Sequence, residues 1–382
     1  MPALLLLGLL ASDPTLILAH SMPWYEAPPH SAGYGYHWTM QAFDPLADPP
    51  RWASHYRPEI GLYDSADPAV IEYQLLSMKL AGFDGVIVDW YGTSDLWDYP
   101  TLHRNTIALF EGCERFGLRF SLCYEDKTLR NLVAQDRLED GQIVDQAVRD
   151  LAWAAENWFP SEAYVRLDGR PVLLSFGNAG LTDEQWTDTL RRLRGDDVDI
   201  AYFSEHTKRS AALGAYDWPL PSEGLAAVER FHERTAGELA IPVAFPRFVD
   251  IYKEAGVGDG YPEIPDNDGR TLRKTLYHAL KRSPPFVQVA TWNDWGEGTQ
   301  VEPSDEFGTR DLETLQSMRR QYVDEAFRFD AADLALPKEL LALRRDGGDA
   351  AALDRVAEAI AAGQVGNARR LLRTARTAGR AK

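Results

Sequence analysis

The chain has 382 residues, 45% of them hydrophobic and 11% aromatic, which is enough for the core of one large domain. Its formal net charge of −18 argues against nucleic acid and against anionic membranes as partners, because both require a basic protein surface. The two cysteines, Cys113 and Cys123, are too few for a framework of disulfides, and we expect both to be buried thiols.

An apolar run near the N-terminus, Leu4 to Leu10, has the length of the hydrophobic part of a signal peptide. No lysine or arginine precedes it, since the first of these is Arg51, and the run is too short to span a bilayer. The first predicted strand begins near Thr15, so cleavage after the run would leave almost no leader. We assign residues 1–14 to a leader or a disordered N-terminus. The missing basic segment favours a cytoplasmic location over export.

Short apolar stretches that recur along the chain are predicted as strands, and helical patterns separate most of them. They cover residues 15–19, 83–90, 118–124, 171–176, 200–204, 214–218 and 241–248, and the last begins at residue 286. Asp67 followed by Pro68 marks the start of the first helix between them. This alternation over residues 15–330 predicts a parallel, closed (β/α)8 TIM barrel. From Ala331 onward, a composition rich in Ala, Leu and Arg predicts a short helical extension over residues 331–382.

A long connection, residues 21–67, follows the first strand and contains nine aromatic residues and many prolines. Loops of this length inside a compact domain are usually functional, so we interpret it as a folded lid over the barrel mouth. Its candidates for contact with a sugar are Trp24, Tyr25, His37 and Trp38. The alternative is that these aromatic residues only pack the loop onto the barrel.

Acidic and aromatic residues also follow the predicted strands at the point where each ends. Asp89 and Tyr91 follow the second strand, and Glu125 follows the third. Barrel enzymes build their sites at the C-terminal ends of the strands, so these three side chains are candidates for substrate binding. An acid at such a place can equally serve only as a turn or cap residue.

The stretch FVQVATWNDWGEGTQVE, residues 286–302, places two carboxylates, Asp294 and Glu297, directly after the eighth strand. Hydrolysis of a glycosidic bond needs one carboxylic acid to protonate the departing oxygen and a second carboxylate to help at the ring. Trp295 offers an apolar face to a pyranose, and Asn293 can hydrogen-bond hydroxyl groups. A turn rich in Asp, Asn and Gly is also common without any catalytic role, so a purely structural turn is the alternative.

The segment NDWGEGTQVE resembles the carboxylate motif of glycoside hydrolase family 99, the endo-α-mannosidases, and that of family 71, the α-1,3-glucanases. LILAHSMPWYE at 16–26, GYHWTM at 35–40, GVIVDWYG at 85–92 and CYED at 123–126 follow in the order expected for this group, which includes WbsX-like proteins. The resemblance covers roughly residues 15–330. It implies a TIM-barrel glycoside hydrolase that acts within an α-linked polysaccharide or oligosaccharide of the mannan or glucan type.

The resemblance also implies roles for the two carboxylates. Glu297 falls on the general acid/base of family 99, and Asp294 falls on the residue that acts as a base on the neighbouring 2-hydroxyl. Family 99 has Glu at the first position, whereas this chain has Asp, as in family 71. Members of family 99 retain the anomeric configuration and members of family 71 invert it, so both outcomes stay open here.

Two other functions remain from the sequence: a carbohydrate-binding protein without catalysis, and a WbsX-like glycosyltransferase. The chain has no DxD-like nucleotide-diphosphate site in a loop of the expected kind and no phosphate-cradling GxxxxGK[ST] or GxGxxG motif. Its Cys and His spacings do not suit zinc. We therefore expect a carbohydrate substrate, with no cofactor, no metal, no nucleic acid and no membrane partner. The sequence does not indicate an oligomeric state.

Overall fold

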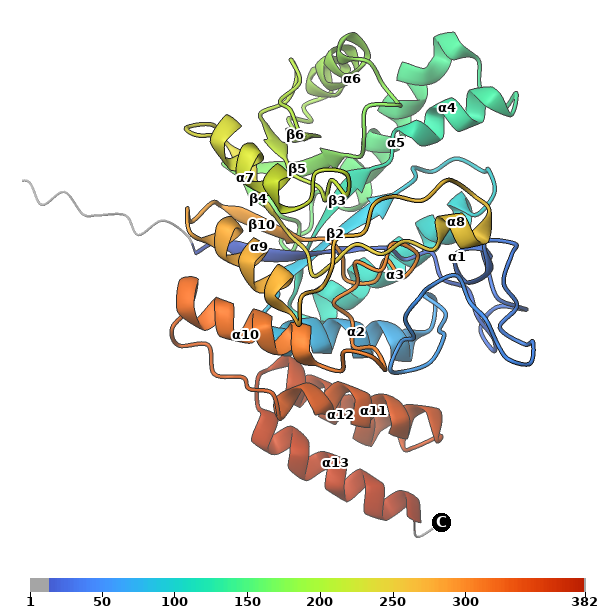
Figure 1. The fold of residues 1–382 in the computed structure, drawn as a ribbon, viewed down its shortest axis with the longest axis vertical. Coiled ribbons are helices and arrows are strands. Elements are labelled where there is room, and N and C mark those ends of the chain that lie inside the picture. The colour runs from blue at the N-terminus through green and yellow to red at the C-terminus, as the bar shows by residue number, and fades with distance from the viewer. Residues whose placement is uncertain (1–13, 381–382) are drawn as a thin grey trace, which may run out of the picture.

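A ring of short parallel strands forms the centre of the computed structural model, which describes residues 14–380 (Figure 1). The hydrogen-bonded order is β8-β7-β6-β5-β3-β2-β1-β10-β9, and every pair along it is parallel. The strands are β1 (Leu16–Ser21), β2 (Gly85–Trp90), β3 (Arg119–Tyr124), β5 (Arg170–Ser175), β6 (Ala201–Glu205), β7 (Gly214–Tyr216), β8 (Ala240–Ile241), β9 (Val243–Ala244) and β10 (Phe286–Val289). A short β4 (Arg166–Leu167) pairs antiparallel with β5.

The strands β8 and β9 occupy one position of the barrel, because only Pro242 separates them. Proline has no N–H to donate to a neighbouring strand. Its carbonyl still accepts from the backbone N–H of Gln288 at 3.1 Å, while β8 pairs with β7 and β9 with β10. The seventh predicted strand is therefore shorter than residues 241–248 and ends at Ala244. Because β8 and β9 share one position, the barrel has eight strand positions, and the predicted (β/α)8 class is confirmed.

Helices surround the strands, as the alternating pattern predicts. On the outside of the barrel lie α2 (Pro68–Ala81), α3 (Tyr99–Phe116), α4 (Lys127–Ala134), α5 (Ile143–Asn157), α6 (Asp183–Gly195), α7 (Leu225–Arg234), α9 (Arg270–Leu280) and α10 (Arg310–Tyr322). Single turns are α1 (Tyr36–Thr39), α8 (Tyr252–Ala255), η1 (Asp140–Gln142) and η2 (Asp333–Ala335). The predicted start of α2 is confirmed, since the Asp67 carboxylate caps the N–H of Ala69 at 2.8 Å. No helix within residues 14–380 combines the length and the apolar character that a membrane crossing requires.

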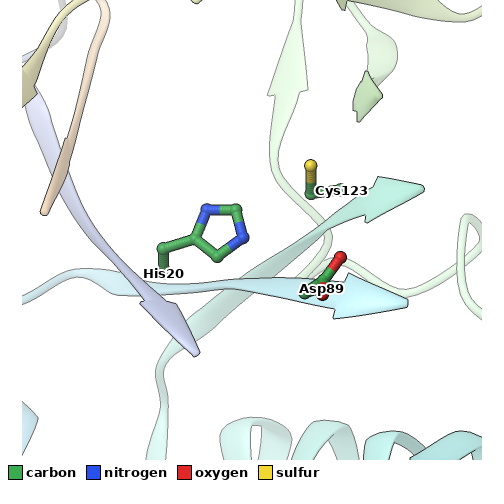
Figure 2. Close-up of side chains that lie close together, drawn as sticks. All are labelled: His20, Asp89 and Cys123. Carbon is green, nitrogen blue, oxygen red and sulfur yellow. The ribbon is translucent and has the colours of Figure 1, made fainter. Parts of the chain in front are cut away.

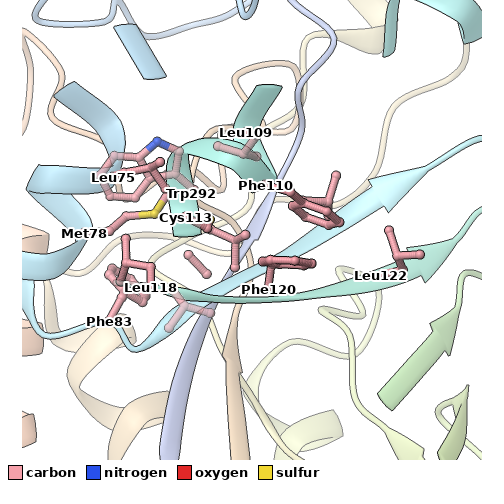
Figure 3. Packing of buried hydrophobic residues seen from close by; sticks show 14 of the residues in the cluster. Leu75, Met78, Phe83, Leu109, Phe110, Cys113, Leu118, Phe120, Leu122 and Trp292 are labelled. Atoms are coloured by element: carbon pink, nitrogen blue, oxygen red, sulfur yellow. The ribbon is translucent and has the colours of Figure 1, made fainter. Parts of the chain in front are cut away.

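Apolar side chains fill both sides of the strands, because neighbouring residues of a strand point to opposite faces. Leu18, Ile87 and Cys123 belong to the cluster inside the barrel. The outer cluster lies between the strands and the helices, where Phe110 of α3 stacks on Phe120 of β3 with ring centroids 3.9 Å apart (Figure 3). Both cysteines are buried and free, as predicted from the sequence.

The C-terminal extension consists of α11 (Leu336–Arg345), α12 (Ala350–Ala361) and α13 (Val365–Arg380). The helices α11 and α12 lie beside α2, and α13 packs on α11 and α12 (Figure 1). Only Pro68, Ala69 and Lys79 of α2 are not buried. The apolar residues of the extension belong to the same cluster as those of α2, and Arg344 pairs with the α2 carboxylate Glu72 at 2.9 Å. The extension therefore continues the outer core of the barrel. The predicted leader, residues 1–14, lies outside the described residues except for Pro14.

Candidate active site

The turn after β10 holds the two candidate catalytic carboxylates in a fixed arrangement. The N–H of Asp294 donates to Oγ1 of Thr291 at 2.7 Å, and Oδ1 of Asp294 accepts from the N–H of Glu297 at 3.0 Å. Gly298 has a φ of +67°, and a Cβ added there would lie 2.6 Å from the carbonyl oxygen of Val249. Glycine is thus required at position 298, because any side chain would be strained at this φ and would collide with the Val249 carbonyl. Asp294 is buried and Glu297 is half-buried, so solvent has little access to either carboxyl group.

Asn293 fastens this turn to the end of β1. Its Oδ1 accepts from the N–H of Met22 at 2.8 Å, and its Nδ2 donates to the Met22 carbonyl at 3.0 Å and to the Tyr63 hydroxyl at 3.1 Å. These contacts use the amide group within the protein, and the residue is 1% exposed. The structure therefore gives Asn293 a supporting position rather than the sugar contact that we predicted.

Three of the predicted sugar-stacking residues belong to the same network of hydrogen bonds that holds the turn after β10. The Tyr25 hydroxyl donates to the Asn293 carbonyl at 2.9 Å and accepts from the N–H of Trp295 at 3.0 Å. The indole N–H of Trp295 reaches the Tyr63 hydroxyl at 3.2 Å, and that of Trp38 reaches the Tyr63 carbonyl at 2.8 Å. Tyr25, Trp38 and Trp295 are at most 1% exposed. Their aromatic faces are thus covered by protein, as in the alternative in which the loop only packs onto the barrel.

The other predicted residues lie nearer to open space. Trp24 is half-buried and stacks on His37, with ring centroids 4.1 Å apart and planes 7° apart. His37, Tyr91 and Glu125 line a cavity of about 630 Å³. Its wall also includes Tyr36, Gln41, Trp97, Asp98, Tyr99, Lys127, Thr128 and Asn131. A cavity of this volume with aromatic and hydrogen-bonding walls suits a sugar ligand.

Burial raises the pKa of both catalytic candidates, and the different neighbours of the two carboxyl groups separate the values. It raises the pKa of Asp294 to about 6, and the N–H groups of Glu297 and Gly296 and the nearby His37 oppose the rise. The pKa of Glu297 is raised well above its usual value, first by burial and then by the charge of Asp294. A hydrogen bond from the Tyr252 hydroxyl, 3.2 Å from Oε1 of Glu297, works in the opposite direction. Glu297 can therefore hold a proton while Asp294 is ionised, the division that an acid and a base require.

Further acids surround this pair. Burial, followed by the charge of Asp294, raises the pKa of Asp89 to about 8. The pKa of Glu125 is raised by burial and then by Asp89. Glu205 at the end of β6 has a pKa raised by burial, which the neighbouring His206 opposes. A neutral carboxyl group can donate as well as accept a hydrogen bond, which suits sugar hydroxyls.

No family model matches the chain. Its sequence is 22% identical over 352 residues to a glycoprotein endo-alpha-1,2-mannosidase-like protein of Danio rerio, covering 77% of this chain and 75% of that protein. A protein of the same description from Mus musculus is 21% identical over 316 residues and covers 73% of this chain and 67% of its own length. The family 99 endo-alpha-mannosidase structure from Bacteroides thetaiotaomicron superposes with a TM-score of 0.61 at 16% identity, covering 81% of this chain and 99% of that one.

By sequence and by fold, the chain resembles glycoside hydrolase family 99. This family 99-like barrel brings together residues that the sequence analysis did not select. Tyr252 lies on the single turn α8, and nothing in its sequence neighbourhood distinguishes it from other loop tyrosines. Glu205 is the last residue of β6 and Asp217 directly follows β7, so the strand-end argument that selected Asp89 would have found them too.

Proposed function

We propose that this protein is a glycoside hydrolase that cleaves α-linked mannose-type polysaccharides or oligosaccharides within the chain. The observation that carries the proposal is the separation of proton affinity between two neighbouring carboxylates at the mouth of a barrel. Asp294 has a pKa of about 6, while burial and the charge of Asp294 raise that of Glu297 well above its usual value. The endo-mannosidase names of its relatives support the choice of sugar and the internal cleavage.

In the proposed reaction, Glu297 donates its proton to the departing glycosidic oxygen. Ionised Asp294 acts at the ring, either by removing the proton of the neighbouring 2-hydroxyl or by activating water. Tyr252 holds the carboxyl group of Glu297 through its hydroxyl and stabilises the carboxylate that forms once the proton has left. His37, Tyr91 and Glu125 contact the sugar in the adjoining cavity.

The test is product release from a panel of α-mannans, mannose-containing oligosaccharides and α-1,3-glucans, with the anomeric configuration followed by proton NMR from the first minutes. Oligosaccharide products from an α-mannan support the proposal, and the first-formed anomer distinguishes the two roles of Asp294. Cleavage of the glucan alone would contradict the mannose-type assignment. Binding of a glycan without cleavage of any would favour a non-catalytic binding protein.

The pH profile of kcat/KM should be bell-shaped. Asp294 must be ionised, so activity should fall as the pH drops through about 6, its pKa. Glu297 must carry a proton, and because its pKa is raised, the alkaline limb should lie well above the ordinary range of a glutamic acid. The profile measured with the best substrate of the panel checks both limbs. An alkaline limb below pH 6 would contradict these assignments.

Tyr252→Phe should lower kcat about tenfold, because a hydrogen bond to a charged group contributes about 1.5 kcal/mol or more. Its loss should also move the alkaline limb to higher pH, since the Tyr252 hydroxyl lowers the pKa of Glu297. Tyr261→Phe is the matched control, because Tyr261 lies in the same loop and is 58% exposed. An unchanged alkaline limb in Tyr252→Phe would show that the hydroxyl does not act on Glu297.

A further inference from the structure

We infer that His20, Asp89 and Cys123 form a binding site for one Zn²⁺ ion, or a similar first-row divalent ion, at the floor of the barrel mouth (Figure 2). One ligand atom from each residue lies within 4.8 Å of the others. The three side chains come from β1, β2 and β3 and are at most 3% exposed. Metal binding at this place is a property separate from glycan hydrolysis, so each can be tested without the other.

Strand register brings these residues to one side of the sheet. Asp89 and Cys123 are direct partners in the β2–β3 pair, and His20 is the partner of Ile87 in the β1–β2 pair. Residues two apart on a strand share a face, so Asp89 lies on the face of Ile87. Ile87 and Cys123 both belong to the apolar cluster inside the barrel. The three ligand candidates therefore point into the interior near the C-terminal ends of β1, β2 and β3, and Figure 2 shows them close together.

The hydrogen bonds around His20 leave one ring nitrogen free to bind a metal. The Nε2 group of Gln288 donates to the Asp217 carbonyl, which turns Oε1 of Gln288 toward Nδ1 of His20 at 3.2 Å. An amide oxygen can only accept, so Nδ1 carries the proton and Nε2 has an available lone pair. Nε2 is buried and has no partner among the described residues. A histidine that binds a metal usually has its other N–H held in this way.

The carboxylate and the thiol are similarly available. Oδ1 of Asp89 is buried without a hydrogen-bond partner in the described part of the chain. Sγ of Cys123 lies 3.7 Å from the Tyr216 hydroxyl, which donates its own proton to the Ser175 carbonyl at 2.9 Å. Buried polar atoms without partners are costly, and a bound cation would satisfy Nε2 of His20 and Oδ1 of Asp89. The Cys123 thiol has the Tyr216 hydroxyl as its partner. On binding, the protons of the Cys123 thiol and of the Asp89 carboxyl group are released to solvent, and the thiolate and the carboxylate become ligands.

These donors match the preferences of zinc. Imidazole nitrogen, carboxylate oxygen and thiolate sulfur bind Zn²⁺ at about 2.0–2.3 Å, which places tetrahedral donors roughly 3.3–3.8 Å apart. Side-chain rotations that bring atoms 4.8 Å apart closer by about 1.0–1.5 Å are sufficient. Three protein ligands leave a fourth position for a water molecule. The sequence pattern gave no sign of this site, because the ligands belong to three different β/α units.

The two cysteines allow a matched experiment on the full-length protein. Metal-free protein is titrated with Zn²⁺ in competition with a chromogenic chelator, and with Co²⁺ while the thiolate-to-cobalt charge-transfer absorption is recorded. We expect one equivalent per chain and a thiolate band. Cys123→Ala should lose the band and weaken Zn²⁺ binding at least about 100-fold, more than the loss of an outer-sphere partner usually costs. Cys113→Ala, a buried thiol on α3, should keep both.

Asp89→Asn is a second variant, for the case that Cys123→Ala does not fold, because asparagine has nearly the same shape as aspartate. It should weaken Zn²⁺ binding while the circular dichroism spectrum stays unchanged. Binding should also strengthen as the pH rises, because a thiol proton is displaced. Substoichiometric binding, a cobalt spectrum without a thiolate band, or equal affinity in both cysteine variants would overturn the inference. Any of these outcomes would instead assign Nε2 of His20 and Oδ1 of Asp89 to hydrogen bonds with water or with a sugar hydroxyl.

Discussion

Glu297→Gln should lower hydrolysis of the cleaved glycan at least about a hundredfold, the lower end of what a general acid contributes. Glutamine keeps the shape of the side chain but cannot supply a proton to the departing oxygen. It can still interact with the Tyr252 hydroxyl, so the turn after β10 should keep its position. The measurement is kcat/KM on the substrate identified in the panel, together with the thermal unfolding temperature of both proteins.

Glu254→Gln is the control for this variant. Glu254 lies on α8, two residues from Tyr252, and its side chain is 51% exposed, where it pairs with Arg51 at 3.2 Å. The same chemical change at this position should leave kcat/KM within about twofold, because exposed ion pairs contribute little. Full activity in Glu297→Gln would remove this residue from the mechanism and would transfer the acid role to another carboxyl group at the barrel mouth.

Arg247→Met should lower the free energy of unfolding by about 3–5 kcal/mol, the usual cost of breaking a buried ion pair by removing one partner. The Arg247 guanidinium is fully buried, pairs with the buried Asp311 and lies 3.4 Å from Asp266. It also donates to the Gln300 carbonyl at 2.8 Å and lies over the Phe307 ring, 3.7 Å from its centroid. Methionine fills much of the volume but removes the charge that faces Oδ2 of Asp311, and it leaves this buried carboxylate with Arg310, 3.0 Å from Oδ1, as its remaining ion-pair partner. The expected fall in unfolding temperature is on the order of 10 °C.

Arg270→Met tests whether the loss of any arginine has this effect. Arg270 and its partner Asp268 are 76% and 96% exposed, and the pair is 3.9 Å apart. Its removal should change stability by no more than about 0.5 kcal/mol. Because Arg247 holds the segment that follows Glu297, its loss should reduce activity as well as stability. Equal stabilities of the two variants would mean that Arg310 alone compensates the charge of Asp311 in Arg247→Met.

The fold could be predicted from the sequence because each strand of a parallel barrel is a short apolar run with its own flanking signals. Asp67 and Pro68 marked a helix start through purely local chemistry, and the structure has that cap. The strand with the largest excess in predicted length, residues 241–248, contains Pro242 and ends where its backbone leaves the sheet. Propensity alone does not show where a strand loses its neighbour.

The candidate site was only partly predictable for a physical reason. Asp294 and Glu297 share one turn, so their proximity follows from the chain itself. The sequence gave no indication of which aromatic faces would meet solvent, and both Trp38 of the loop and Trp295 of the turn after β10 are enclosed. His20, Asp89 and Cys123 are far apart in sequence, and only the parallel register of three strands brings them together.

The helix α2 packs against the barrel on one side and against α11 and α12 on the other. An outer helix of such a barrel ordinarily keeps one face in water, where substitutions accumulate freely because they cost little. In α2 that freedom is lost, since even its carboxylate Glu72 is buried against Arg344. Evolutionary drift in this helix is therefore coupled to the extension: a lineage that lost residues 331–382 would have to acquire a polar stripe along α2 at the same time.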